Sequence, residues 1–372
     1  MIIHRVKIFY RFIIYNFFFL IYKKPDLLIK KFKKFSYNIL NIKIKNNKYY
    51  LFKIINGRIY TNTIHDTAYI LDNYLLNGPS FQYRNSINSK IGNNICLKIG
   101  TPRFLKKVKG KVLSLLAGGG ANVNYSHWLF DVLPRLYLYK KKDPLNKLDF
   151  LLVPNFKLEF QKTTLKILGF SKDKILDSTS IRHLSADELY ATSHPRYHKA
   201  NNICQWHVQF LKKSFLNPTI KNTFCNENIY LDRGESFLLK NSNWHDLKDK
   251  YRLIINEDEV KSYLLSKGFK IIKSQDLSFL QQVDLFSNLK CIVTLHGAGL
   301  SNLVFCRANT KVIEITTREN SDIFPKVLSK LCNLKYYSIS LKTFYKSRVT
   351  QNGLMFCPLS KINQALKNLN VI

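Results

Sequence analysis

The segment from Cys291 to Ile315, CIVTLHGAGLSNLVFCRANTKVIEI, constrains the fold of this chain more than any other. Its apolar ends predict two buried strands, and the glycine turn and apolar run between them predict a helix that returns the chain to the same sheet. A tight turn after a parallel strand directs backbone N–H groups and a helix N-terminus at one point. That arrangement suits a phosphate or diphosphate, so we expect a nucleotide site at the turn.

The turn and the strand that follows it carry the polar groups of such a site. Gly297 and Gly299 allow the backbone to approach a ligand closely, with Ala298 between them. His296 begins the turn and can hydrogen-bond a diphosphate or a nucleoside, or it is a strand-end histidine satisfied by its neighbours. Glu314 ends the next strand and can accept a ribose hydroxyl or pair with a lysine. The turn matches neither GxGxxG nor a Walker loop.

Short apolar strands alternate with helices along most of the chain, which predicts α/β domains built on parallel sheets. We expect two doubly wound, Rossmann-like domains facing across a cleft that binds the ligand. Asn56 and Gly57 predict the turn of a hairpin between residues 49 and 60. The expected divisions are a basic aromatic segment (1–35), a first α/β domain (36–217), a second α/β domain (218–345) and an extension with a terminal helix (346–372).

The chain is strongly basic, with 59 lysine and arginine residues, 24 aspartate and glutamate residues and a formal net charge of +35. A field of this sign favours anionic partners such as nucleotides, acidic polysaccharides, acidic lipid head groups or nucleic acids. An AT-rich coding sequence produces the same lysine bias without functional meaning. The seven cysteines are scattered and include no CxxC pair, so we expect neither a disulfide framework nor a zinc site, and a reducing compartment.

The segment from Ile8 to Tyr22, IFYRFIIYNFFFLIY, is apolar, aromatic and flanked by basic residues. It is shorter than the ~20 apolar residues of a spanning helix, and Arg11 and Asn16 interrupt it. No small-residue cleavage site follows, which argues against a signal peptide. We expect a helix on the surface of an anionic membrane, with a helix packed on the protein as the alternative and a spanning helix as the least favoured case. The protein is then cytoplasmic and peripheral on the inner face of the membrane.

A second set of polar residues lies on a predicted helix that begins near Ser126. His127, Asp131 and Arg135 follow at i, i+4 and i+8, so they line one stripe opposite an apolar face. Asn124 or Ser126 is expected to cap the start. Asp131 can orient His127 for service as a general base. The alternative is a solvated i,i+4 ion pair.

Two further features lie in the second domain. Arg233 follows a predicted strand, where a guanidinium can hold phosphate oxygens in bidentate fashion. Asn256 precedes three acidic residues at a helix start, where an N-cap with first-turn acids is a sufficient structural explanation. No DxD pair occurs, so a metal-bound donor is not indicated. We expect Arg233, lysines and a helix dipole to neutralise the charge of a diphosphate.

Several of these segments, taken in order, resemble glycosyltransferase family 61, including its bacterial members linked to capsular polysaccharide synthesis. The resemblance covers about residues 111–339, and its strongest part runs from Tyr230 to Ile315. The motifs that carry it are NYSHWLFDVLPRL (124–136), YLDR (230–233), the segment 252–257, LSFLQQVDLFSN (277–288) and LHGAGLSNLVF (295–305).

The resemblance implies a GT-B fold, an inverting mechanism and a nucleotide-sugar donor used without a metal or other cofactor. The second domain is expected to hold the nucleotide, and the first to face a glycan or polysaccharide acceptor. The alternative is a non-catalytic basic protein that binds membrane or nucleic acid with a steep salt dependence; we favour the enzyme and expect no nucleic-acid partner. The residues expected in these roles are Arg233, Asn256, His296, Gly297, Ala298, Gly299 and Glu314 for the nucleotide sugar, His127 and Asp131 for catalysis, and Asn124 and Arg135 on the acceptor side. Either His127 or Asp131 is the base that deprotonates the acceptor hydroxyl.

Overall fold

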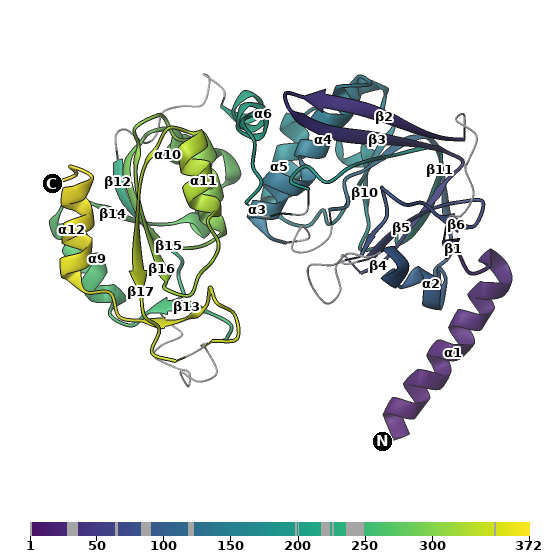
Figure 1. Cartoon of the computed structure of the whole chain (residues 1–372), viewed down its shortest axis with the longest axis horizontal. Helices are drawn as coiled ribbons and strands as arrows, with labels where there is room; N and C mark the ends of the chain where they lie inside the picture. The colour runs from purple at the N-terminus through teal and green to yellow at the C-terminus, as the bar shows by residue number, and fades with distance from the viewer. Residues whose placement is uncertain are drawn as a thin grey trace. The chain divides into compact units, whose positions relative to one another are not determined.

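The computed structural model describes residues 2–27, 36–63, 66–82, 91–117, 123–197, 199, 201–216, 224, 227–235, 249–345 and 347–372. The chain forms two compact units, Met1–His198 and Lys199–Ile372 (Figure 1). Residue 217, where we predicted the boundary, lies outside the described residues.

The division precedes the predicted one because helix α6 (Gln205–Phe215) belongs to the second unit. The ring of Phe215 stands edge-on to those of Phe279 and Phe305, with centroid distances of 5.0 and 6.4 Å. The ammonium of Lys212 donates to the carbonyl oxygen of Cys306 at 2.9 Å. These contacts anchor α6 to the second core.

The first unit is built on a mixed sheet that has 11 strands within the described residues. Its main path runs β1-β6-β5-β4-β11-β8-β9-β10. The strands are β1 (Asp26–Leu27), β2 (Tyr37–Ile44), β3 (Asn47–Ile55), β4 (Arg58–Thr63), β5 (Asp66–Leu71), β6 (Tyr74–Leu75), β7 (Phe81–Gln82), β8 (Lys106–Ser114), β9 (Phe150–Val153), β10 (Ile175–Asp177) and β11 (His183–Thr192).

The prediction of a doubly wound first domain is therefore wrong for this sheet. Strands β8, β9, β10 and β11 pair in parallel, but β2, β3, β4 and β5 form antiparallel pairs with one another or with β11. The connections from β2 to β6 are too short for a parallel crossover, which needs a dozen or more residues. Short connections between these strands thus produce the antiparallel half.

The predicted hairpin at Asn56 and Gly57 is also wrong. Strands β3 and β4 follow each other along β11 in one register instead of pairing together. The N–H of Asn56 and the carbonyl oxygen of Gly57 both bond to β11, so the ladder continues through the pair. The hairpin forms one strand earlier, between β2 and β3, where Lys45 has a φ of 52°.

Helix α1 (Ile2–Tyr22) contacts the rest of the first unit through its last turns (Figure 1). The ring centroids of Phe18 and Phe104 are 5.1 Å apart, and the hydroxyl of Tyr22 accepts a hydrogen bond from the N–H of Leu105 at 3.0 Å. Among the helices that the structure describes, none is long and apolar enough to cross a membrane.

The predicted helix from Ser126 onward consists of three pieces: α3 (Tyr125–His127), a π-helical turn η3 (Trp128–Val132) and α4 (Pro134–Lys140). Pro134 has no N–H to continue the ladder, and the N–H of Leu133 bonds five residues back to Trp128 at 3.0 Å. The apolar face is buried as expected. Helices α2 (Cys96–Ile99) and α5 (Glu159–Ile167) complete the α-helices described in this unit.

The second unit has the predicted parallel α/β architecture. Five parallel strands, β12 (Glu227–Asp232), β14 (Lys270–Lys273), β15 (Leu289–Leu295), β16 (Lys311–Thr317) and β17 (Lys335–Leu341), lie in the order β14-β12-β15-β16-β17. Strands β13 (Arg252–Ile254) and β18 (Gly353–Met355) form a separate parallel pair. The helices between the strands are α9 (Glu257–Ser266), α10 (Phe279–Ser287), the 3-10 helix η7 (Ala298–Phe305) and α11 (Phe324–Leu331), and α12 (Leu359–Asn368) follows the last strand.

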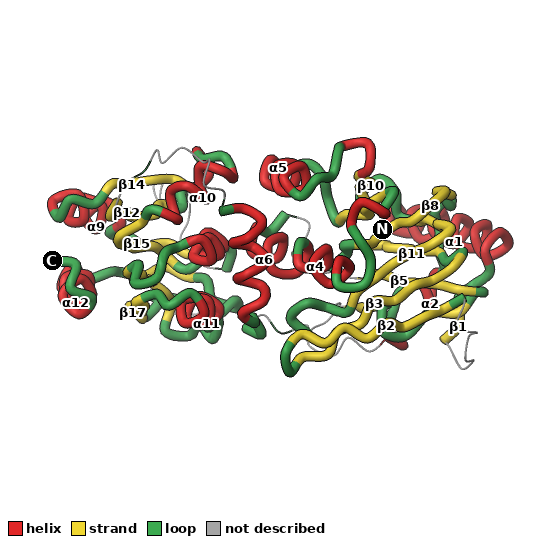
Figure 2. Tube along the Cα trace, turned by 90° about the horizontal axis from the view of Figure 1, so that it is seen from above, coloured by secondary structure: helices red, strands yellow, loops and turns green. Residues whose placement is uncertain are grey.

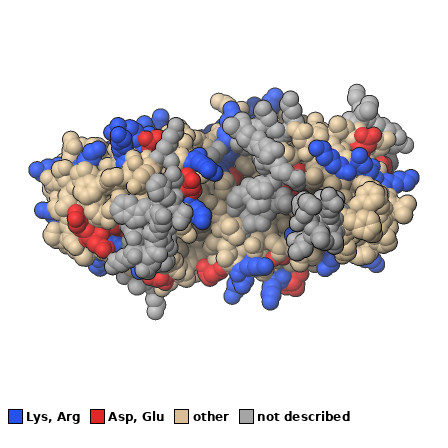
Figure 3. Space-filling model, turned by 90° about the horizontal axis from the view of Figure 1, so that it is seen from below, with Lys and Arg blue, Asp and Glu red and all other residues tan. Residues whose placement is uncertain are grey.

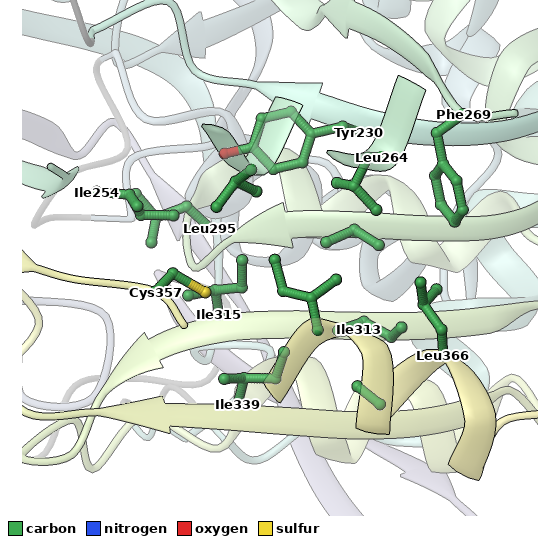
Figure 4. Close-up of a cluster of buried hydrophobic side chains, with 14 of the residues drawn as sticks. Tyr230, Ile254, Leu264, Phe269, Leu295, Ile313, Ile315, Ile339, Cys357 and Leu366 are labelled. Carbon is green, nitrogen blue, oxygen red and sulfur yellow. The ribbon is translucent and has the colours of Figure 1, made fainter. Parts of the chain in front are cut away.

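Helices cover both faces of this sheet: α9 and α12 lie on one side, and α10 and α11 on the other (Figure 2). Tyr230, Leu295 and Ile313 point from the strands into the core on the α9 and α12 side (Figure 4). Ile362 and Leu366 of α12 belong to the same core. The segment predicted as an extension therefore completes the hydrophobic core of the second unit.

Candidate functional site

The strand order of the second unit creates a cavity where the order reverses, between β12 and β15. In doubly wound sheets, ligands bind outside the carboxyl ends of the strands at this point. A cavity of about 180 Å³ lies there. It is lined by Leu231, Asp232, Arg233, Glu235, Ser274, Thr294, Leu295, Gly297, Ala298, Gly299 and Leu300. The structure thus brings Arg233 and the glycine turn together, as predicted from the sequence.

Arg233 lies directly on the glycine turn. Its Nη1 donates to the carbonyl oxygen of His296 at 2.8 Å. A Cβ on residue 297 would lie 2.4 Å from that same Nη1, so Gly297 leaves room for the guanidinium. A Cβ on Gly299 would lie 3.2 Å from Cδ2 of Leu231. The absence of a side chain at Gly297 therefore allows, first of all, the guanidinium of Arg233 to approach the turn.

His296 and Glu314 lie inside the protein. His296 is 4% exposed and Glu314 is 2% exposed. Nδ1 of His296 bonds to Oε1 of Glu314, whose other oxygen accepts from the hydroxyl of Tyr336, and Nε2 of His296 is 3.5 Å from Asp322. Burial alone would lower the pKa of His296, but its hydrogen bonds to Asp322 and Glu314 outweigh this and raise the pKa above its ordinary value. The pair therefore supports the turn, and direct contacts with a diphosphate or ribose stay predictions.

Asn256 has a structural partner. Its side chain makes no cap hydrogen bond at the start of α9, contrary to our expectation. Its Oδ1 accepts from the N–H of Cys357 at 2.9 Å, and its Nδ2 donates to the carbonyl oxygen of Cys357 at 3.0 Å. Asn256 thus joins the start of α9 to the segment before α12, and its role in nucleotide binding stays a prediction.

Arg252 is a site neighbour that the sequence did not identify as part of the site. It is 5% exposed, and its Nη1 donates to the same carbonyl oxygen of His296 that Arg233 contacts. Burial and the charge of Arg233 lower the pKa of Arg252 to about 10. Two guanidinium groups therefore converge on one carbonyl at the edge of the cavity. The sequence signal for Arg252 was its position at the start of the segment 252–257, one of the segments that carry the family resemblance.

In the first unit, Asp131 is the centre of a buried charged cluster. Asp131 is 3% exposed, and its Oδ2 accepts from Nδ1 of His127 at 2.5 Å. This burial rules out the solvated ion pair. The side chain of His127 is 36% exposed. A proton on Nδ1 leaves Nε2 as the acceptor of the ring, and Nε2 has no hydrogen-bond partner within the part of the chain that the structure describes.

Arg196 completes this cluster, and nothing in the sequence identified it. Its Nε donates to Oδ1 of Asp131 at 2.6 Å and its Nη2 to Oδ2 at 2.8 Å, while Nε2 of His194 lies 3.6 Å from Oδ1. Burial raises the pKa of a carboxyl, but Arg196, His194 and the bond from His127 outweigh it and hold the pKa of Asp131 well below its usual value. Asp131 is thus an anion that orients His127.

Asn124 and Arg135 support the same helix. The side chain of Asn124 caps α3, because its Oδ1 accepts from the N–H groups of Ser126 at 2.9 Å and His127 at 3.2 Å. Arg135 is 3% exposed and donates to the carbonyl oxygen of Thr192 on β11 at 2.9 Å. Both residues therefore position the His127 segment, and their contact with an acceptor stays a prediction.

The described residues contain no group of three or more His, Cys, Asp or Glu side chains arranged to hold a metal ion. The arrangement offers two separate chemical functions. The first unit presents an oriented imidazole that can accept a proton. The second presents a guanidinium and a backbone turn that can hold an anion.

A comparison with protein families identifies the family of this chain. The family model described as Glycosyltransferase 61 matches residues 125–313, which include His127, Asp131, Arg196, Arg233 and His296. The chain belongs to this family and is a glycosyltransferase. Membership implies a nucleotide-sugar donor and a glycan acceptor at a coarse level, and it decides against a non-catalytic binding protein. A search of curated proteins gave no match.

Proposed function

We propose that this glycosyltransferase moves a sugar from a nucleotide-sugar donor to a hydroxyl of a glycan or polysaccharide acceptor, with inversion at the anomeric carbon and without a metal. The observation that carries the proposal is the orientation of His127 by the buried pair of Asp131 and Arg196. In line with the sequence resemblance, we place the acceptor in a surface or capsular polysaccharide. A GT-B-like division of roles, with the acceptor on the first unit and the donor on the second, is part of this proposal.

The proposed reaction begins with a proton transfer. Nε2 of His127 takes the proton of the acceptor hydroxyl, whose oxygen then attacks the anomeric carbon. The bond from that carbon to the nucleoside diphosphate breaks, and the diphosphate leaves with the electron pair from the opposite face. Asp131 stabilises the imidazolium that forms. Arg233 and the backbone N–H groups of residues 297–299 stabilise the departing diphosphate.

Two steps test this proposal. A panel of sugar nucleotides is first screened for binding to the wild type, and site variants are then compared in turnover assays. A donor that binds the native protein raises its thermal unfolding temperature and so identifies the substrate for turnover assays. His127→Ala and Asp131→Asn are each expected to reduce turnover by about 10²–10⁴-fold, and the double variant little more, because the two residues act as one unit. Donor binding is expected to survive in all three.

The matched control is Asp173→Asn, which removes a fully exposed carboxylate from the same unit. The turnover of the Asp173→Asn variant should equal that of the wild type. Near-normal turnover of His127→Ala with saturating acceptor would assign the base elsewhere.

We also propose that α1 holds the enzyme on the inner face of an anionic membrane. Large apolar side chains on α1 are exposed, namely Phe9 at 66%, Phe12 at 64% and Leu20 at 87%. Lys23 and Lys24 follow the helix and are exposed. An exposed aromatic helix with flanking lysines suits the head-group region, where rings enter the interface and lysines meet lipid phosphates.

Vesicle co-sedimentation tests the membrane proposal. The triple variant Phe9→Ser, Phe12→Ser and Leu20→Ser should lose binding to vesicles that contain anionic phosphatidylglycerol, without a change in unfolding temperature. Phe344→Ser with Phe356→Ser removes two exposed rings from the second unit and should bind like the wild type. Equal binding by the triple variant would show that α1 is not the anchor.

A further inference from the structure

The guanidinium of Arg233 already holds an anion. Its Nε donates to Oε2 of Glu235 and its Nη2 to Oε1, both at 3.2 Å. Both residues line the cavity at the carboxyl ends of β12 and β15. The carboxylate therefore occupies the fork of donors with which arginine binds phosphate in bidentate fashion.

The local sequence forces this pairing. The chain turns at Gly234, just after β12, where Oδ1 of Asp232, the last residue of the strand, accepts from the N–H of Gly234 at 2.7 Å. Gly234 has a φ of 69°, a left-handed conformation that glycine adopts without a steric penalty. The turn places Glu235 beside Arg233, two positions earlier in the chain.

The pair is accessible to a competing anion. The side chains of Arg233 and Glu235 are 31% and 27% exposed. Partly exposed ion pairs contribute little to stability, so a ligand with more charge can replace the carboxylate at small cost. Arg252 donates to the same carbonyl oxygen of His296 as Arg233, so the two guanidinium groups lie close together, and Glu235 is one of the carboxylates that offset their charge.

We propose that Glu235 is a placeholder carboxylate, which the diphosphate of the donor displaces from Arg233. This inference rests on the proposed function, because it takes the cavity to be the diphosphate site. Glu235 then compensates Arg233 while the cavity is empty and competes with every incoming anion. Its removal should therefore strengthen binding, whereas removal of a residue that contacts the ligand weakens it.

Calorimetric titration of the full chain with inorganic pyrophosphate and with nucleoside diphosphates tests this. Glu235→Gln is expected to bind both kinds of ligand about two- to fivefold more tightly than the wild type, as expected for loss of a competing pair of this exposure. In an Arg233→Ala background, Glu235→Gln should bring no gain, because the effect acts through the guanidinium.

Glu227→Gln is the matched control. Glu227 begins β12, at the end of the strand opposite the cavity, and pairs with Lys270 at 2.7 Å. The Glu227→Gln variant should bind pyrophosphate and nucleoside diphosphates with the affinity of the wild type.

Unchanged or weaker binding by a folded Glu235→Gln, while the wild type binds, would overturn the placeholder and leave the donor site intact. Weaker binding would make Glu235 a ligand contact or a support for Arg233. A wild type that binds neither pyrophosphate nor any nucleoside diphosphate would overturn the donor site itself, and the placeholder with it.

Discussion

At the scale of single residues, Asp131 shows how the first unit keeps a buried charge. Taking a carboxylate out of water costs several kcal/mol, which a well-placed counter-ion with good hydrogen bonds can offset. Arg196 supplies that counter-ion, because two of its nitrogens meet the two oxygens of Asp131. The same contact leaves His127 as the exposed member of the cluster.

Arg196→Ala should lower the free energy of unfolding by about 3–5 kcal/mol, because it leaves Asp131 buried and unpaired. Urea unfolding at neutral pH measures the loss. Arg103→Ala, which truncates an exposed side chain of the same unit, should stay within about 0.5 kcal/mol of the wild type. Similar values for the two variants would contradict the burial of the Asp131 charge.

Gly297 has a role that depends on its neighbour, not on its own backbone angles. Its φ of 171° is extended and open to any residue, but a Cβ there would meet the guanidinium of Arg233. The end of an arginine side chain moves readily, so the fold tolerates the change while the guanidinium leaves its place.

Gly297→Ala is therefore expected to weaken pyrophosphate binding about as much as Arg233→Ala does, with little change in unfolding temperature. The double variant should bind no more weakly than Arg233→Ala alone, because both changes remove the same contact. Calorimetry gives the affinities. A further loss in the double variant would mean that the ligand contacts the turn at Gly297 itself.

At the scale of elements, the junction between α1 and β11 depends on a neutral histidine. Nδ1 of His183 donates to the carbonyl oxygen of Arg103 at 2.9 Å, and Nη1 of Arg58 lies 3.2 Å from Nε2. The ring of Tyr22 stands edge-on to the imidazole at 4.9 Å. Burial lowers the pKa of His183 to about 4.

This depressed pKa predicts acid sensitivity. Between the unfolded value of 6.5 and the folded value of about 4, the unfolded state binds more protons, so stability falls as the pH falls through that window. The contribution is about 2–3 kcal/mol between pH 7 and pH 4.5. Urea unfolding at the two pH values should show a smaller loss for His183→Gln than for the wild type. Equal losses would place the sensitivity in other groups.

At the scale of the whole molecule, the two units carry the two halves of the proposed chemistry. The second unit has a core of its own, which α9 and α12 close on one face of its sheet. The basic charge is not confined to one unit: lysine and arginine side chains occur across the face shown in Figure 3, with acidic residues among them.

Residues 199–372 expressed alone should unfold cooperatively and bind pyrophosphate with the affinity of the full chain, since every residue of the proposed diphosphate site lies in this unit. The fragment should transfer no sugar, because His127 lies in the other unit. Calorimetry and a turnover assay measure both properties. A folded fragment that fails to bind would show that the first unit contributes to the donor site.

The parts of the site that the sequence predicted correctly are those that lie close together in it or at the ends of neighbouring parallel strands. Asn124 caps the helix that carries His127, and Asp131 meets His127 at i+4. Arg233 and Gly297 meet because parallel strands end at the same sheet edge, so strand order alone places them together. Arg196 could not be predicted in this way, because its contact with Asp131 spans 65 positions and depends on how β11 ends.

The sequence by itself determined the alternation of strands and helices in the second unit, since hydrophobic periodicity and turn residues act over a few neighbours. The tertiary structure decided what depends on distant partners. In the folded chain, β3 and β4 follow each other along β11, and no hairpin forms at Asn56. Glu314 hydrogen-bonds to His296. Pairing of distant strands and satisfaction of buried charges depend on the whole core, because only the folded chain brings those partners into one low-dielectric space.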